Sequence, residues 1–232
     1  MNNRRRILLC VSLAMILPVV AALLYFVLLA GTRLAWVIYS AIKVFALIWP
    51  VVAVLWIEKQ PFRFESISTA KHIRAIPAGI LSGLAIGALM IALFRLSPLG
   101  DYVRSHSETI RGKVESMGIV RYYILFAVFV AFFNSFMEEY YWRWYVFGRL
   151  RKTVHVVLAY GLAGLAFGGH HYVVLSCYFP AWGTALFGTC VGIGGGFWCW
   201  LYARQRSLVG CWVSHLLADV AILYIGYTLI LP

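Results

Sequence analysis

Apolar stretches long enough to cross a membrane recur along the whole chain, and this feature constrains the fold more than any other. Hydrophobic residues make up 63% of the 232 positions and charged residues only 12%, which is not the composition of a water-soluble domain. About 20 apolar residues in a helix span the ~30 Å hydrocarbon layer, and a helix satisfies its own backbone hydrogen bonds there. The sequence therefore predicts an all-α fold, a polytopic transmembrane helical bundle that forms a single integral membrane domain over residues 1–232. Seven spans are expected, at residues 7–30, 34–57, 76–96, 120–147, 154–175, 181–202 and 208–231.

Small residues spaced four apart mark two faces where helices can approach each other closely. Gly79, Gly83 and Gly87 form one such face on the third span. Gly188, Gly192 and Gly196 form the other, on the sixth span. We expect both faces to serve helix packing and neither to carry chemistry.

The basic residues are arranged as orientation signals rather than as a binding face. The chain has 20 Lys and Arg against 8 Asp and Glu, and the basic residues gather in every second connection between spans. Cytoplasmic connections carry such an excess, so we expect an integral, multi-pass protein of a bacterial-type inner or cell membrane, with its N-terminus cytoplasmic and its C-terminus outside. No nucleic-acid partner is expected, because no basic stripe with interleaved exposed aromatic residues remains outside the spans. The clusters are Arg4, Arg5 and Arg6; Lys59, Arg63, Lys71 and Arg74; Arg149, Arg151 and Lys152; and Arg204 and Arg206.

The connection at residues 97–118 differs from the others because its basic residues are matched by acidic ones. Its spacing suits a short amphipathic helix on the outer membrane surface. The charged residues are Arg104, Arg111, Lys113, Asp101, Glu108 and Glu115.

Acidic and histidine side chains gather inside three of the predicted spans. An ionisable group at the centre of a bilayer costs ~2.5–3.5 kcal/mol on insertion scales, so such a cluster indicates a functional site by default. Lys43, in another span, is less informative, because a long side chain can reach an interface or pair with one of these acids. The clustered residues are Glu138, Glu139, His170, His171, His215 and Asp219.

Helical spacing sorts several of these residues into pairs. Glu139 and Arg143 stand four positions apart, so they can form an ion pair along one helix face. Glu138 points about 100° away from that face and is available for another task. His215 and Asp219 also stand four apart, so the carboxylate can fix which ring nitrogen of the histidine faces a cavity.

Such a set of groups is suited to the hydrolysis of an amide bond. A glutamate can take a proton from a water molecule that a histidine holds, and a second histidine with its partner can stabilise the oxyanion. Structural interpretations stand beside the catalytic one. A pair such as Glu139–Arg143 is more often structural than catalytic, and His170 is more often a satisfied neighbour than a participant.

Three short patterns follow one another on successive predicted spans: Glu138-Glu139-x-x-x-Arg143, Phe167-x-x-x-His171 and His215-x-x-x-Asp219. Together they resemble the CAAX protease and bacteriocin-processing enzyme family of intramembrane glutamic endopeptidases, which is related to the type II CAAX prenyl endopeptidase. The resemblance covers a motif-bearing core of about residues 119–225. It implies an intramembrane endopeptidase that uses a glutamate-activated water and no cofactor.

The resemblance also implies a role for each motif residue. Glu138 would be the general base that activates water, and His171 would help to hold that water. Glu139 and Arg143 would support the site. His215 would form the oxyanion side together with the residue at position 219.

Two positions depart from the pattern of the family. Relatives often have Asn where this chain has Asp219, and a carboxylate cannot donate to an oxyanion unless it is protonated. We therefore expect Asp219 to orient His215. Many relatives carry Gly where this chain has Trp144, so the local helix packing must differ. The aromatic residues at 140–145 are interpreted as an interfacial belt, with a groove for a lipidated or apolar tail as the alternative.

Other functions compatible with these residues stay open. Glu138, His171 and His215 could bind a catalytic zinc, although the sequence has no His-Glu-x-x-His helix. A transporter or proton relay also places Glu, His and Arg inside a membrane, and Asp219 would suit a catalytically inactive member of the family. The expected partners are a membrane-anchored protein or peptide substrate and the membrane lipids. C-terminal processing and protein sorting are both roles that cleavage of this substrate could serve.

Glu138, His171 and His215 can form one site only if they lie at the same depth in the membrane. At 1.5 Å per residue, His171 lies at the far end of a span that begins at Val154, whereas His215 lies near the start of its own span. We therefore expect the fifth span to begin near Tyr160, with residues 149–159 partly a loop or interfacial segment.

Overall fold

The computed structural model describes residues 2–61 and 68–231, so Arg63, one of the predicted orientation charges, lies outside the described residues. The described part of the chain is helical and contains no strand. Seven of its helices are long and apolar enough to cross a membrane, which confirms the predicted all-α, multi-span architecture. The spans are Asn3–Leu28, Arg33–Ile57, Thr69–Leu96, Val120–Leu150, Val156–Leu175, Ala181–Gln205 and Leu208–Ile230.

The chain divides into two compact units, which are described separately. The first consists of Met1–Ile67 and Met137–Arg206, and the second of Ser68–Phe136 and Ser207–Pro232. The division falls within the fourth span, inside the short helix α7 (Ser135–Glu138). The prediction that all 232 residues form a single domain is not tested by this division.

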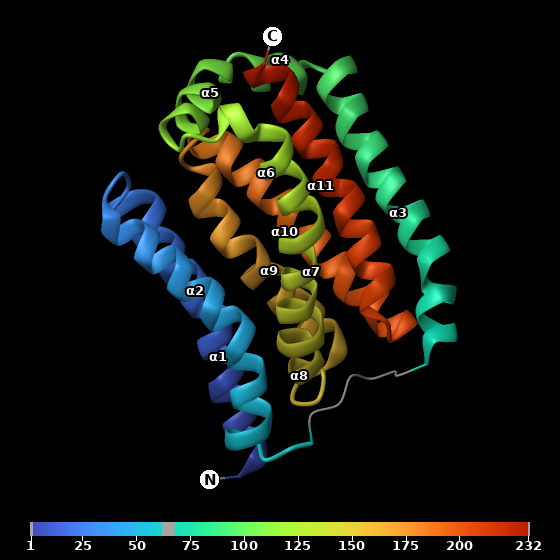
Figure 1. Ribbon diagram of the computed structural model, residues 1–232. Coiled ribbons are helices and arrows are strands. Elements are labelled where there is room, and N and C mark those ends of the chain that lie inside the picture. Colours follow the sequence, from blue (N-terminus) through green and yellow to red (C-terminus); the bar gives the residue numbers. More distant parts are fainter. Residues whose placement is uncertain (1, 62–67, 232) are drawn as a thin grey trace. The chain divides into compact units, whose positions relative to one another are not determined.

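The first unit is built from two helix pairs that pack against each other. Its elements are α1 (Asn3–Ala22), the π-helix η1 (Leu23–Leu28), α2 (Arg33–Val52), the π-helix η2 (Ala53–Ile57), the π-helix η5 (Glu139–Phe147), α8 (Gly148–Leu150), α9 (Val156–Leu175) and α10 (Ala181–Gln205). Helix α1 packs against α2 and α9, and α9 packs against α10 (Figure 1). Each of η1 and η2 follows a helix that contains a proline, Pro18 in α1 and Pro50 in α2, whose missing N–H removes one α-helical hydrogen bond.

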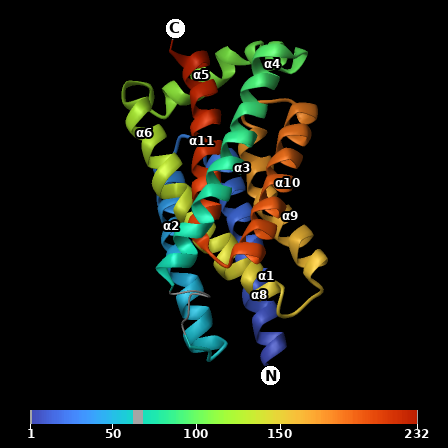
Figure 2. The ribbon, with the colours of Figure 1, turned by 90° about the vertical axis from the view of Figure 1, so that its right-hand side faces the viewer.

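The second unit is dominated by one long helix pair with surface helices at its end. Its elements are α3 (Thr69–Leu96), α4 (Pro98–Arg104), α5 (Ser107–Ser116), the 3-10 turn η3 (Val120–Tyr122), α6 (Tyr123–Phe129), the π-helix η4 (Val130–Asn134) and α11 (Leu208–Ile230). Helix α11 packs against α3 and also against α5 and η4. Figure 2 shows α4 at the end of α3, with α11 alongside.

Glycines allow the closest helix approaches in both units, as the spacing predicts. A Cβ atom at Gly83 would lie 2.8 Å from the carbonyl oxygen of Ser214, so α3 meets α11 at this face. A Cβ atom at Gly164 would lie 2.7 Å from the carbonyl oxygen of Gly192, so α9 meets α10 at the other face. The partner of the predicted sixth-span glycines is thus a second glycine face on α9.

Side-chain caps and left-handed residues set several helix ends. Asn2 accepts from the N–H of Arg4 where α1 begins, and Ser207 accepts from the N–H of Val209 where α11 begins. Gly31 has φ +81° between α1 and α2, and Arg206 has φ +51° at the end of α10. Both residues stop the preceding helix by leaving right-handed helical geometry.

Three boundaries differ from those predicted. Helix α3 begins at Thr69, so Lys71 and Arg74 lie on the helix and not in the connection. The predicted amphipathic helix at 97–118 is two helices, α4 and α5. The prediction that the fifth span begins near Tyr160 is wrong, because α9 begins at Val156 with His155 as its cap. At 1.5 Å per residue, His171 therefore lies about 22 Å along α9.

Candidate active site

The first motif lies where the fourth span changes from an α-helix into a π-helix. Helix α7 ends at Glu138, and the π-helix η5 begins at Glu139. Such wide turns are rare and occur frequently at functional sites. Glu139 and Arg143 are both fully buried, and Oε1 of the glutamate lies 3.2 Å from Nη1 of the arginine. The ion pair expected from the spacing is therefore present in the structure.

The guanidinium of Arg143 also lies over two aromatic rings. Its Cζ is 4.4 Å from the ring centroid of Phe167 on α9 and 5.1 Å from that of Trp198 on α10. A cation over a ring away from water is stabilised by about 2 kcal/mol or more. Since Phe167 opens the second motif, this contact joins the first two motifs within one unit. Trp198 is absent from the predicted site, because nothing in its spacing shows which helix it faces.

The same phenylalanine also orients the motif histidine. Nδ1 of His171 donates to the backbone carbonyl of Phe167 at 2.9 Å. A carbonyl oxygen can only accept, so this bond places the ring hydrogen of a neutral His171 on Nδ1. Nε2 is then the nitrogen that can accept a hydrogen bond from water.

His170 is packed among aromatic rings, but its buried Nδ1 has no hydrogen-bond partner among the described residues, so its hydrogen bonding is not satisfied as expected. Its ring is parallel to that of Trp142, with centroids 5.7 Å apart, and lies edge-on to Phe167. The rings of His170 and His171 are 4.0 Å apart. The two histidines and Trp142 therefore form one cluster beside the ion pair.

Glu138 lies within electrostatic reach of His170 and of Tyr25 on η1. Lys43 on α2 also acts on His170, and its Nζ is 5.5 Å from the ring centroid of Tyr39. The rings of Tyr25 and Tyr39 meet edge to face at 5.4 Å. The first two spans thus bring a lysine and two tyrosines to the surroundings of Glu138. Neither tyrosine is predicted from the sequence, because aromatic residues are common throughout the spans.

The aromatic residues of η5 anchor this helix inside the unit. Tyr140 donates to the carbonyl of Leu47 on α2 at 3.2 Å, and Tyr141 donates to that of Ala14 on α1 at 2.7 Å. Trp144 is buried and stacks on Tyr140 with centroids 5.3 Å apart. These residues are packed against α1 and α2, so their interpretation as an interfacial belt is wrong.

The third motif forms its predicted pair within the second unit. Nε2 of His215 lies 3.5 Å from Oδ1 of Asp219, and His215 is buried. That this pair meets Glu138 and His171 stays a prediction, because the two units are described separately. Within the part of the chain that the structure describes, no three His, Cys, Asp or Glu side chains are grouped so as to hold a metal ion.

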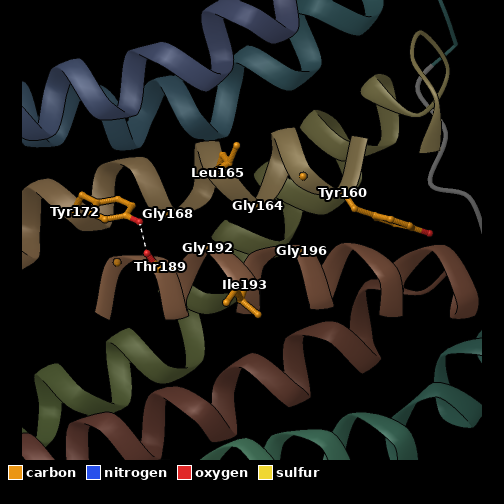
Figure 3. A pocket seen from close by; sticks show the side chains of 11 residues that line it. Tyr160, Gly164, Leu165, Gly168, Tyr172, Thr189, Gly192, Ile193 and Gly196 are labelled. Carbon is orange, nitrogen blue, oxygen red and sulfur yellow. Dashed lines mark hydrogen bonds between the residues drawn. The ribbon is translucent and has the colours of Figure 1, made fainter. Parts of the chain in front are cut away.

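A cavity of about 340 Å³ runs between the glycine faces of α9 and α10 (Figure 3). Backbone from glycines such as Gly164 and Gly192 lines it, and the hydroxyl of Tyr172 bonds Oγ1 of Thr189 at 2.7 Å across the two helices. None of the predicted site residues lines this cavity. We therefore attribute it to helix packing and not to the active site.

A family model matches residues 120–221, and its description is type II CAAX prenyl endopeptidase Rce1-like. All three motifs, from Glu138 to Asp219, lie inside the match, which confirms the resemblance stated above. No curated protein and no solved structure matches the chain. The seven apolar helices indicate an integral, multi-pass membrane protein, and the match shows that residues 120–221 are similar in sequence to a CAAX-type protease family. Residues 120–221 are therefore similar to the type II CAAX prenyl endopeptidase Rce1-like family.

Proposed function

We propose that the protein is a glutamate-dependent intramembrane endopeptidase that hydrolyses a peptide bond of a membrane-associated protein or peptide. The observation that carries this proposal is the chain of contacts from Arg143 through Phe167 to His171, which holds the first two motifs together within one unit. The family match over the same residues supports a CAAX-type protease.

Glu138 is proposed as the general base. It takes a proton from a water molecule while Nε2 of His171 accepts a hydrogen bond from the same water. The water oxygen then attacks the carbonyl carbon of the scissile bond, and the proton passes from Glu138 to the leaving amine. The neighbouring Glu139–Arg143 pair supports this step. The pair is buried, and Arg143 contacts the rings of Phe167 and Trp198, so the helix that carries Glu138 is held in place.

The oxyanion side is assigned to His215 and Asp219. An imidazolium has two N–H donors, one of which Asp219 can accept, while the other can donate to the oxyanion. In this scheme Asp219 orients His215 and makes no contact with the substrate. The distance of 3.5 Å between the two side chains is compatible with that role.

The test compares membranes that contain the wild-type protein with membranes that contain Glu138→Gln. Mass spectrometry of the membrane proteome should find a C-terminal fragment with the wild type only, because removal of a general base lowers a rate by about 10²–10⁴-fold. Glu108→Gln, which changes an exposed glutamate on α5, is the matched control and should cleave like the wild type. Thermal unfolding of Glu138→Gln verifies that the variant is folded.

Three outcomes separate the candidate functions. Cleavage by purified Glu138→Gln protein would contradict the glutamate mechanism. Loss of wild-type cleavage after exhaustive chelation, with recovery on adding zinc, would favour the alternative in which Glu138, His171 and His215 bind zinc. A proteome without any fragment specific to the wild type would favour an inactive family member, a transporter or a proton relay.

We further propose a cell-membrane location with a cytoplasmic N-terminus and an outside C-terminus, from the basic clusters in alternate connections. The two units would then act as one membrane domain with its motif-bearing core at about residues 119–225. C-terminal processing and protein sorting remain the proposed roles. The fragment identified above would decide between them.

A further inference from the structure

A cavity of about 550 Å³ lies in the second unit, at the C-terminal ends of α3 and α11. Helices α3, α4, α5 and α11 all contribute to it, and it contains no residue of the three motifs. Two guanidinium groups and two hydroxyl groups give it a polar character that the glycine-lined cavity lacks. Its lining residues are Phe94, Arg95, Arg104, Ser107, Thr228 and Leu229.

Both arginines of this cavity are oriented by neighbouring groups. Nη1 of Arg104 donates to the carbonyl of Phe94 at 3.1 Å, and Nη2 donates to Asp101 at 2.8 Å. The same guanidinium lies 5.0 Å from the ring centroid of Phe94. Nη2 of Arg95 donates to the hydroxyl of Tyr224 at 2.9 Å. A guanidinium carries five N–H groups in a rigid fork, so these contacts fix its direction and leave capacity for a ligand.

The cavity lies where two spans end. Helix α3 ends at Leu96 and α11 at Ile230, so this end of the pair marks a membrane surface. Apolar side chains of α3 are exposed in the turns before the cavity: Leu89 by 60% and Leu93 by 41%. A ligand with an anionic head and an apolar chain could therefore place its head in the cavity and its chain along α3.

We propose that this cavity binds a phosphate group, and that the phosphate belongs to the headgroup of an anionic membrane phospholipid. Guanidinium groups bind phosphate oxygens through charge-assisted, paired hydrogen bonds, and the hydroxyl of Ser107 adds a further donor. The hydroxyl of Thr228 lines the cavity but donates to the carbonyl of Ile225 at 2.8 Å. Basic pockets between spans bind anionic headgroups in the same way. Asp101 neutralises part of the charge of Arg104, and Arg95 restores a net positive balance.

Helix stabilisation alone does not account for this arrangement. A basic side chain in the last turn of a helix favours the helix dipole, which would suffice for Arg95 on α3. It does not require a second guanidinium from another helix, held at a fixed angle, with the hydroxyl of Ser107 beside the same space. A phosphate group uses all three.

The test uses the full-length protein in detergent and native mass spectrometry. The probes are phosphatidylglycerol, zwitterionic phosphatidylcholine and inorganic phosphate, each titrated separately. We expect phosphatidylglycerol to stay bound at concentrations where phosphatidylcholine does not. Competition by millimolar inorganic phosphate at equal strength would assign the site to free phosphate instead, and lack of competition assigns it to the lipid.

Variants identify the cavity as the place of binding. Arg104→Gln should weaken phosphatidylglycerol binding about tenfold, the effect of losing one charge-assisted contact. The matched control is Arg111→Gln on α5, which removes the same charge from a side chain of similar exposure, 53% against 44% for Arg104, and should bind like the wild type. Asp101→Asn should bind more tightly, because it removes the carboxylate that competes with phosphate for Arg104.

Misfolding cannot produce the tighter binding expected of Asp101→Asn. This variant therefore distinguishes binding at the cavity from a general loss of folded structure. Equal losses in Arg104→Gln and Arg111→Gln would overturn the proposal, because binding would then follow net charge alone. Binding in Asp101→Asn that is no tighter than in the wild type would also overturn it. The proteolytic activity is not used in any of these measurements, so the result is independent of the proposed endopeptidase function.

Discussion

Arg143 keeps a full charge inside the first unit because three different groups compensate it. Glu139 supplies the opposite charge, and Phe167 and Trp198 supply the faces of two rings. The ion pair could be predicted from the sequence, because both partners lie on one helix at a spacing of four. The rings could not, because helical periodicity carries no information on which other helix a face will meet.

The buried pair predicts a strong coupling between its two partners. Glu139→Gln should destabilise the protein by about 3–5 kcal/mol, because it leaves the charge of Arg143 without its carboxylate. The double variant Glu139→Gln/Arg143→Met should recover much of this loss, since an apolar chain then lies between the two rings. Thermal unfolding of the purified variants in detergent measures both effects.

An exposed ion pair is the control for that experiment. Arg111 and Glu115 form a pair with the same spacing and a distance of 2.8 Å, but both are about half exposed. Glu115→Gln should change stability by less than about 1 kcal/mol. Equal effects at both pairs would show that the burial of Glu139–Arg143 has no energetic consequence.

Glu58, just after the second span, predicts a pH dependence of stability. Its Oε2 lies 2.8 Å from Nε of Arg149, and burial raises the pKa of the carboxyl above 4.5 although Arg149 and Lys152 oppose this shift. The folded protein therefore holds the proton of Glu58 more tightly than the unfolded chain does. This contribution to stability is fully present below about pH 4.5 and is lost as the pH rises through the raised pKa.

Unfolding temperatures measured across this pH range check the prediction. The wild type should show a decline with rising pH that Glu58→Gln lacks, because the amide does not ionise. Glu108→Gln should retain the decline, since that residue is exposed. A wild-type slope that persists in Glu58→Gln would assign it to other groups.

At the scale of elements, composition predicts where the apolar part of a span begins but not where its helix begins. All seven spans were predicted, yet α3 starts seven residues before its predicted apolar stretch at residue 76, since the backbone hydrogen bonds continue into a polar turn. The break between α4 and α5 at Ser105 and His106 was also missed. The glycine faces were predicted correctly, because spacing alone determines which glycines share a face.

The α3–α11 contact predicts opposite effects of the same substitution at two glycines. Gly83→Ala should destabilise the protein by about 1–3 kcal/mol, because its Cβ would lie 2.8 Å from Leu217 and from the carbonyl oxygen of Ser214. Gly112→Ala on α5 meets nothing within 4 Å and should be stabilising by up to about 1 kcal/mol. Thermal unfolding of both variants tests the two predictions. An unchanged stability in Gly83→Ala would contradict the packing face, and destabilisation by Gly112→Ala would contradict the prediction for an open position.

At the scale of the whole molecule, the seven spans require that successive connections alternate between the two sides of the membrane. Reporter fusions test the proposed orientation. Alkaline phosphatase inserted in the 97–118 connection should be active, because that connection is expected outside, whereas the same reporter inserted at residues 151–155 should be inactive. The reverse pattern would invert the orientation.

The three motifs could be found from the sequence because each is short and lies on a single helix. The surroundings of Glu138 could not, because Tyr25, Tyr39 and Lys43 come from the first two spans, far away in the sequence. Only the packed structure brings them together. Sequence reasoning thus predicts candidate reactive groups but not the side chains around them.

The hydroxyl bonds of Tyr140 and Tyr141 bear on whether the family-like region can exist by itself. Their acceptors are carbonyl groups of Leu47 and Ala14, which lie on helices before residue 120, outside the family match. In a fragment limited to residues 120–221, these hydroxyls would lose their hydrogen-bond acceptors, and the surface of η5 that contacts α1 and α2 would be exposed to lipid. The region with the motifs is therefore not expected to fold by itself. A foreign scaffold that received it would have to supply helices equivalent to α1 and α2 to contact η5.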